Sequence, residues 1–153
     1  EKKAVLGEVA RYSEGEGFRV VHYSVLGDHV HFVVEAQGDE GLRHGVSGLC
    51  SCVARALNEV WGRHGKVLAD RYFSRLLRTP SEVRNVLKYV LHNARNHGYW
   101  LWDDRPDPCS SGECFEGWED YEARAPRGWL AAARSWLLRE GWRRAGPIRL
   151  AYD

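Results

Sequence analysis

The first 36 residues carry a hydrophobic pattern that predicts a short helix followed by a β-hairpin. Apolar residues recur at helical spacing within residues 1–12. Two later runs, residues 18–25 and 29–36, are rich in β-branched side chains and flank the turn-forming residues Leu26-Gly27-Asp28. A short turn between two such runs is typical of an antiparallel hairpin.

Two histidines stand two residues apart in the second predicted strand. Side chains alternate between the faces of a strand, so His29 and His31 point to the same side, about 7 Å apart at the backbone. Val30, Phe32 and Val34 point to the other side, which we expect to face the core. Two imidazoles in this arrangement can ligate one metal ion, and Glu35 on the same face can add a charge to the site.

Three further elements are expected after the hairpin. Apolar residues spaced three and four apart predict a long helix from Asp39 to Arg63, which His64-Gly65 would end. Residues 71–78 contain paired aromatic and apolar side chains and predict another strand. Near the end of the chain, a helix is expected over residues 126–139.

A capped helix is predicted between the expected strand and residue 98. Thr79 and Glu82 have the spacing of a capping box at its start, and Gly98 would close it. Tyr89 and Asn93 are four residues apart and should therefore lie on the same flank of this helix. A phenol in that position is either a packed aromatic with a solvated hydroxyl or a chemically active group.

The composition is that of an ordinary globular protein. The chain has 153 residues, of which 44% are hydrophobic, and this suits one domain or one domain with an appendage. No apolar stretch is long enough to span a membrane, and no signal-type segment follows the charged start, so we expect a soluble intracellular protein. The four cysteines form no paired framework, which favours unlinked thiols over a zinc site. Because the chain contains no methionine, we expect further residues before Glu1 in the natural protein.

Charge is unevenly distributed along the chain although the formal net charge is only +1. Residues 63–95 are mainly basic, residues 99–122 are mainly acidic, and residues 124–149 are basic again. Local positive charge is what binding to a polyanion requires, because each neutralised phosphate releases counterions nearby. The same residues can equally be solvated helix faces.

The last third of the chain differs in composition and predicts an extension, residues 99–153, to a main domain of residues 1–98. Six of the seven tryptophans follow residue 98. Trp129, Trp136 and Trp142 recur every six or seven residues beside arginines, an arrangement that base-stacking platforms share. Aromatic spacing of this kind nevertheless favours packing against the main domain.

Four residues, His29, His31, Tyr89 and Asn93, have the chemistry for cutting a phosphodiester by transesterification. A tyrosine is a suitable nucleophile, because its phenol is also a good leaving group when the strand is rejoined. Two imidazoles and a neutral amide oxygen leave several positions of Mg²⁺ or Mn²⁺ open for phosphate oxygens and water. Paired histidines alone are not specific, since zinc hydrolases carry them as well.

The order of motifs is more restrictive and resembles one family. The matching segments are Val21-His22-Tyr23-Ser24-Val25, Asp28-His29-Val30-His31-Phe32-Val33-Val34, Asp70-Arg71-Tyr72-Phe73 and Leu87-Lys88-Tyr89-Val90-Leu91-His92-Asn93. They resemble the HUH single-tyrosine transposases, above all the REP-associated tyrosine transposases. Two residues depart from many relatives, which have Asn in place of Asp28 and Pro in place of Ala94. Neither change removes a catalytic group.

The resemblance implies an α+β protein with a ferredoxin-like antiparallel sheet, helices packed on it and a small C-terminal extension. Tyr89 would attack DNA to give a 5′-phosphotyrosine, and His29, His31 and Asn93 would hold Mg²⁺ or Mn²⁺. The implied partner is single-stranded or hairpin DNA, bound by a monomer or homodimer in the bacterial cytoplasm at the nucleoid. A central strand would precede Glu1. The basic residues assigned to DNA contacts are Arg71, Arg75, Arg78, Arg84 and Lys88.

Two other functions remain open at the level of sequence. One is a domesticated protein that binds DNA hairpins without cutting them. The other is an unrelated metal hydrolase, in which His29 and His31 would be joined by other histidines of the chain. Those candidates are His22, His44, His64, His92 and His97.

Overall fold

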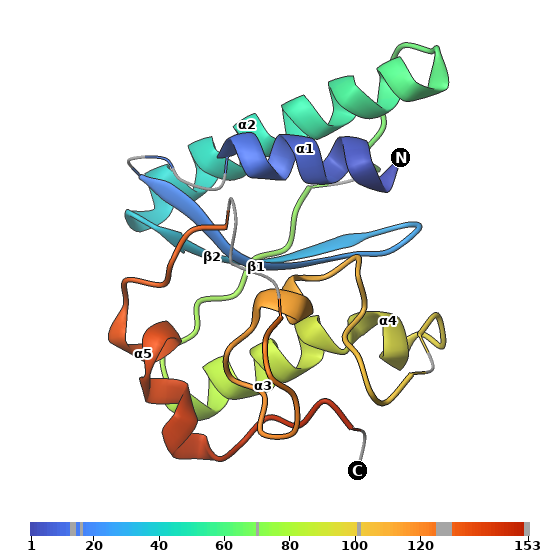
Figure 1. Ribbon diagram of the computed structural model, residues 1–153. Coiled ribbons are helices and arrows are strands. Elements are labelled where there is room, and N and C mark those ends of the chain that lie inside the picture. Colours follow the sequence, from blue (N-terminus) through green and yellow to red (C-terminus); the bar gives the residue numbers. More distant parts are fainter. Residues whose placement is uncertain (13–14, 16, 70, 101, 125–129, 152–153) are drawn as a thin grey trace. The chain divides into compact units, whose positions relative to one another are not determined.

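The computed structural model describes residues 1–12, 15, 17–69, 71–100, 102–124 and 130–151, and their fold is α+β (Figure 1). The helices and strands are α1 (Lys2–Tyr12), β1 (Phe18–Val25), β2 (Val30–Ala36), α2 (Gly38–Trp61), α3 (Pro80–Leu91), α4 (Asn93–Asn96) and α5 (Trp136–Arg139). Two short 3₁₀ turns, η1 (Ser111–Cys114) and η2 (Gly141–Ala145), lie in the last third.

The predicted hairpin is confirmed. β1 and β2 pair with each other, and the N–H of Leu26 donates to the carbonyl of His29 at 2.9 Å across the turn. The expected core face of β2 is wrong in part, because Val30, Phe32 and Val34 are only half-buried. The most buried residue of β2 is Val33, on the same side as the histidines, where it joins a hydrophobic core.

The described residues form two compact units, and unit 1 consists of those that fall within Glu1–Val20, Val34–Leu76 and Trp129–Ala131. Within it α1 and α2 pack together (Figure 1). Gly45 of α2 lies against Phe18, where a Cβ atom would come within 2.1 Å of the ring. The helix α2 ends at Trp61 because Gly62 adopts a left-handed conformation, with a φ of 60°. The predicted end at His64-Gly65 was therefore too late.

Unit 2 contains Val21–Val33, Leu77–Gly128 and Ala132–Asp153. The helix α3 begins with the predicted capping box, in which Thr79 accepts from the N–H of Glu82 and the Glu82 carboxylate accepts in return. Its apolar stripe packs into one core. That core consists of Val21, Val33, Val83, Leu87, Val90, Leu91, Phe115, Trp118, Leu138, Trp142, Ile148 and Leu150.

The tryptophan-rich tail supplies packing residues to unit 2. Trp142 is buried in one core with Val83 and Leu87 of α3, so it packs against the predicted main domain as expected. Trp136 is partly exposed and has the guanidinium of Arg144 over its ring at 4.9 Å. Trp129 lies outside the described residues. The two units do not divide at residue 98, since most of the tail belongs to the unit that holds α3.

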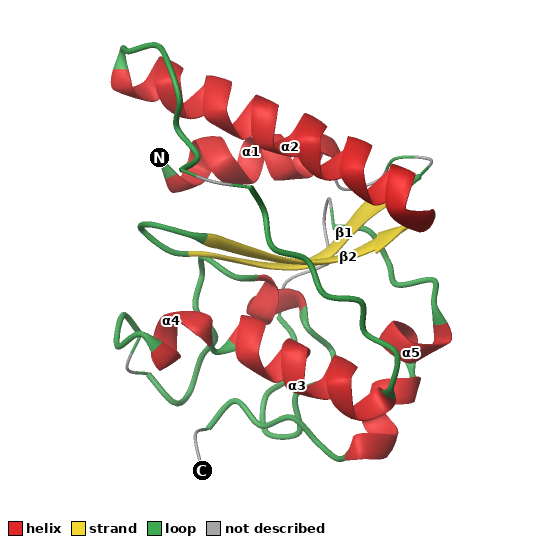
Figure 2. Ribbon diagram, turned by 180° about the vertical axis from the view of Figure 1, so that it is seen from behind, coloured by secondary structure: helices red, strands yellow, loops and turns green. Residues whose placement is uncertain are grey.

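Two predicted elements are corrected. Residues 71–78 form no strand, because strand-forming side chains need a hydrogen-bonded partner and this stretch has no β-ladder in the structure. Of the helix expected over residues 126–139, residues 126–129 lie outside the described part and 130–135 are not helical. Among the described residues of this stretch the helix is α5, and most of the described residues after α4 form loop (Figure 2).

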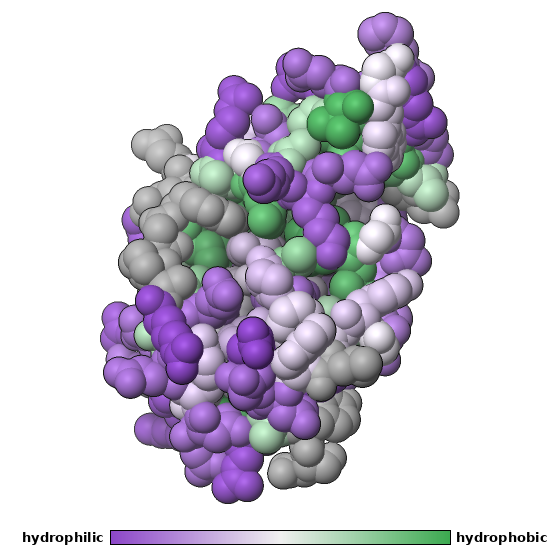
Figure 3. All heavy atoms as spheres, turned by 45° about the vertical axis from the view of Figure 1, so that its right-hand side comes forward, coloured by the Kyte–Doolittle hydropathy of each residue, from purple (hydrophilic) through white to green (hydrophobic). Residues whose placement is uncertain are grey.

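Polar side chains cover most of the face seen in Figure 3. Large apolar residues are nevertheless exposed in the stretch that was expected to be a strand, where Phe73 is 92% exposed and Leu76 is 67% exposed. Among the described helices, none has the length and apolar character to cross a bilayer.

Candidate active site

Unit 2 brings the four residues of the predicted site together. His29 immediately precedes β2 and His31 is its second residue, whereas Tyr89 lies on α3 and Asn93 begins α4. The imidazole rings of His29 and His31 are 5.0 Å apart between centroids, so they do lie on one side of the strand. The rings of His31 and Tyr89 are 5.3 Å apart, and Asn93 Nδ2 is 3.4 Å from His29 Nε2.

Tyr89 is accessible to a large substrate. Its side chain is 47% exposed, although its ring rests edge-on against His31. A phenol that packs against a neighbour on one side and is exposed to solvent on the other can be reached by a polymeric substrate. A tyrosine that merely filled the core would be buried.

Asn93 lies deeper in the protein than Tyr89. The prediction of one helix through residue 98 is wrong, because His92 adopts φ −101° and ψ 9° and interrupts the chain between α3 and α4. Asn93 is fully buried, and its Nδ2 donates to Ser24 Oγ at 3.4 Å.

The donor set fits a divalent cation. His31 Nε2 and Asn93 Oδ1 are both buried and have no hydrogen-bond partner among the described residues. An unsatisfied buried acceptor costs about 1–3 kcal/mol, and a cation held by His31 Nε2 would remove that cost at this atom. No group of three or more His, Cys, Asp or Glu side chains in the described part is arranged to hold a metal. The site is thus two imidazoles and one amide, a weak and exchangeable set.

The carboxylate of Asp28 orients His29. Its Oδ1 lies 2.7 Å from His29 Nδ1, and this hydrogen bond lowers the pKa of Asp28. A carboxylate that accepts from Nδ1 leaves the lone pair of Nε2 facing the site, as is usual for metal-binding histidines. Glu35, the other acidic residue expected near the site, is instead paired with Arg19 in unit 1.

The surroundings of His31 favour its neutral form. Burial lowers its pKa, and the nearby His29 and His97 lower it further. Neutral imidazole is the form that binds a metal, so the surroundings favour a ligand over a cation at this position.

His97 is a further residue of the site, which sequence reasoning had named only among alternative ligands. Its ring centroid is 5.0 Å from that of His29. The residue follows α4, and no spacing in the sequence reveals that it lies beside His29. The other histidines of unit 2 are engaged elsewhere, since His22 contacts Ser111 Oγ at 3.1 Å and His92 contacts the carbonyl of Lys88 at 2.8 Å.

The basic residues assigned to DNA contacts differ in their exposure to solvent. Arg71 and Arg75 belong to unit 1 and are exposed, and Arg78 of unit 2 is exposed as well. Arg84 instead donates to the carbonyl of Pro147 at 2.6 Å, so it ties α3 to the end of the chain. Lys88 is half-buried.

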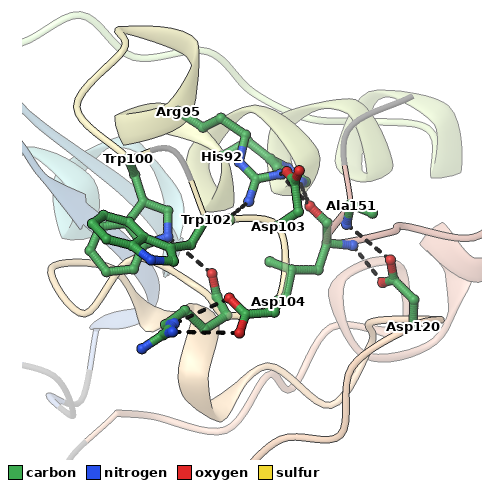
Figure 4. Close-up of polar contacts among 10 residues, drawn as sticks. His92, Arg95, Trp100, Trp102, Asp103, Asp104, Asp120 and Ala151 are labelled. Atoms are coloured by element: carbon green, nitrogen blue, oxygen red, sulfur yellow. Dashed lines mark hydrogen bonds and ion pairs between the residues drawn. The ribbon is translucent and has the colours of Figure 1, made fainter.

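A polar network holds the residues after α4 in place (Figure 4). Arg95 donates to the carbonyls of Leu150, at 2.7 Å, and of Trp102, and it pairs with Asp103 at 2.9 Å. Asp120 accepts from the N–H groups of Leu150 and Ala151 at 2.6 and 2.9 Å. These contacts fix the loop that follows His97.

Comparison with family models, with curated proteins and with solved structures gives no match for this chain.

Proposed function

We propose that this protein is a metal-dependent, single-stranded DNA endonuclease that cuts and rejoins DNA through a 5′-phosphotyrosine. The observation that carries the proposal is the exposed phenol of Tyr89 beside the ring of His31, whose buried Nε2 has no hydrogen-bond partner among the described residues. This is the chemistry of the HUH single-tyrosine transposases that the sequence resembles. Membership of that family and its ferredoxin-like fold are part of the proposal.

In the reaction, Tyr89 Oη attacks the phosphorus of a DNA phosphodiester. The new bond joins Oη to phosphorus, the bond from phosphorus to the 3′-oxygen breaks, and a proton replaces phosphorus on the leaving oxygen. The proton of the phenol passes to solvent, with which the exposed side chain is in contact. Rejoining is the reverse, with a 3′-hydroxyl attacking the phosphotyrosine, so no external energy source is required.

Three side chains would bind the cation and a fourth would orient one of them. His29 Nε2, His31 Nε2 and Asn93 Oδ1 are the ligands, and Asp28 holds the ring of His29. A bound Mg²⁺ or Mn²⁺ would polarise the phosphate and offset the charge that develops on it. Asn93 places Nδ2 toward His29, so presenting Oδ1 to a cation calls for a turn of the amide group.

The test is a search for the covalent adduct. The protein is incubated with Mn²⁺ and an end-labelled pool of single-stranded DNA that includes hairpins, and the products are separated on a denaturing gel. We expect a labelled band at the mass of protein plus DNA, absent in Tyr89→Phe. The matched control is Tyr72→Phe, because Tyr72 is 45% exposed, close to the 47% of Tyr89, and should retain the band.

Three outcomes would contradict the proposal. Binding of DNA by the wild type without any adduct indicates a protein that recognises DNA but does not cut it. An adduct that persists in Tyr89→Phe assigns the nucleophile to another residue. The absence of both binding and adduct points to a different class of function, such as a metal hydrolase.

A further inference from the structure

The aromatic rings of the candidate site continue outward beyond His97. The chain turns at Gly98, which has a φ of 74°, and brings the ring of Tyr99 to 6.5 Å from that of His97, with only 21° between the planes. His97 is in turn 5.0 Å from His29. A row of rings therefore leads from the paired histidines to the surface and ends at Tyr99.

The outer end of this row faces solvent. Tyr99 is 68% exposed, a large fraction for an aromatic side chain that the backbone holds in place. The N–H of Tyr99 donates to the carbonyl of Ala94 at 2.8 Å, and that of Gly98 donates to Arg95 at 2.9 Å. The ring is thus presented from a hydrogen-bonded turn, and its stacking partner in the described residues, His97, covers a single face.

Two acidic residues that follow this turn are paired with arginines, and this pairing reduces their repulsion of DNA. Asp103 is paired with Arg95 at 2.9 Å, and Asp104 is paired with Arg105 at 3.2 Å. The guanidinium of Arg105 also lies 5.8 Å from the centroid of the Trp102 ring, and Trp102 is 50% exposed. Aromatic rings interleaved with arginine are typical of surfaces that bind single strands.

We propose that Tyr99, backed by His97, is a stacking platform for an unpaired base next to the phosphate that Tyr89 attacks. The inference rests on the proposed function and adds the residues that hold an unpaired base of its substrate. A base in a duplex already stacks on its neighbours, whereas an unpaired base has a free π-face. The platform therefore selects single-stranded DNA at the site of cutting, without reading the identity of the base.

Binding is measured in a Tyr89→Phe background, so that affinity is separated from cutting. The probes are a fluorescent 15-nucleotide oligothymidylate and a 15-base-pair duplex, followed by anisotropy over a range of salt concentrations. We expect Tyr99→Ala to weaken binding of the single strand about 10-fold, within the range of a lost base stack. Tyr99→Trp should restore it, and binding of the duplex should stay unchanged.

Two measurements distinguish stacking from other roles. Stacking releases no counterions, so the slope of log affinity against log salt should be the same with and without Tyr99. An oligonucleotide with abasic sites in place of thymidine should bind the Tyr89→Phe protein weakly. Adding Tyr99→Ala to that protein should not weaken this binding further. Trp61→Ala, which removes an exposed ring on α2, is the control and should leave single-strand affinity unchanged.

The proposed platform and the proposed nuclease can fail separately. Equal affinity of the parent and Tyr99→Ala for oligothymidylate overturns the platform, even if the wild type forms covalent adducts. An equal loss for the single strand and the duplex, or an altered thermal unfolding curve, also overturns it, because either result indicates a general effect on the protein. A wild type that shows the stacking contrast but forms no adduct overturns the nuclease alone.

Discussion

The ring of His31 lies edge-on to the ring of Tyr89, with 5.3 Å between the centroids and 80° between the planes. The two residues come from a strand and a helix that are far apart in the sequence but belong to the same compact unit. This contact joins the candidate nucleophile to the candidate metal ligands. It is the relationship on which the proposed chemistry depends.

Replacement of His31 by glutamine should abolish stabilisation of the protein by Mn²⁺. A ligand that binds the folded state raises its free energy of unfolding, and the loss of one of two imidazoles weakens that binding. The measurement is the melting temperature with and without millimolar MnCl₂. His64→Gln, at an exposed position outside the site, should respond to Mn²⁺ as the wild type does. The assignment of ligands is wrong if the two variants behave alike.

Asn93→Asp should make the fold more dependent on the cation. A buried carboxylate without a partner costs more than the amide it replaces, so the metal-free variant should be less stable by about 1–3 kcal/mol. The same charge should bind Mn²⁺ more tightly, and the rise in melting temperature on adding Mn²⁺ should exceed that of the wild type. Asn85→Asp, on an exposed position of α3, is the matched control. A smaller Mn²⁺ response in Asn93→Asp than in the wild type would remove Asn93 from the site.

The sequence was most informative where local chemistry decides the structure. The limits of β1 and the capping box at Thr79 are set by neighbouring residues, and both were predicted correctly. The hairpin also follows from its turn, and it is what places His29 and His31 on one side. These predictions needed no knowledge of distant contacts.

The predictions that the structure contradicts are those that depend on distant contacts or on single backbone angles. Residues 71–78 have strand-forming side chains, but pairing depends on another segment. The ring of His92, where the helix is interrupted, contacts the carbonyl of Leu150, which is 58 residues away in the sequence. The site could therefore be predicted in its parts, but the complete burial of Asn93 and the closeness of His97 to His29 could not.

Gly45→Ala should destabilise unit 1, although alanine is the better helix former. The added Cβ would lie 2.1 Å from Cγ of Phe18, so the ring or the helix must move. We expect a loss of about 1–3 kcal/mol in the free energy of unfolding, measured by urea denaturation. Gly7→Ala on α1 is the control, because no atom lies within 4 Å of its Cβ and the change should stabilise by about 1 kcal/mol. Equal effects at both positions would contradict the contact between α2 and Phe18.

Asp120→Asn should remove an acid-sensitive anchor of the chain end. The N–H groups of Leu150 and Ala151 donate to the carboxylate, and although partial burial opposes them, these bonds lower the pKa of Asp120. A lowered pKa in the folded state means that the stabilisation is complete above the unfolded value, about 4, and is lost as pH falls through the folded value. At pH 6 the variant should therefore exchange the amide protons of Leu150 and Ala151 faster than the wild type, and the difference should shrink below pH 4. Asp104→Asn, whose carboxylate pairs with the exposed Arg105, should leave both amides unchanged at either pH. A difference between wild type and Asp120→Asn that is independent of pH would show that the shape of the side chain, and not its charge, anchors the segment.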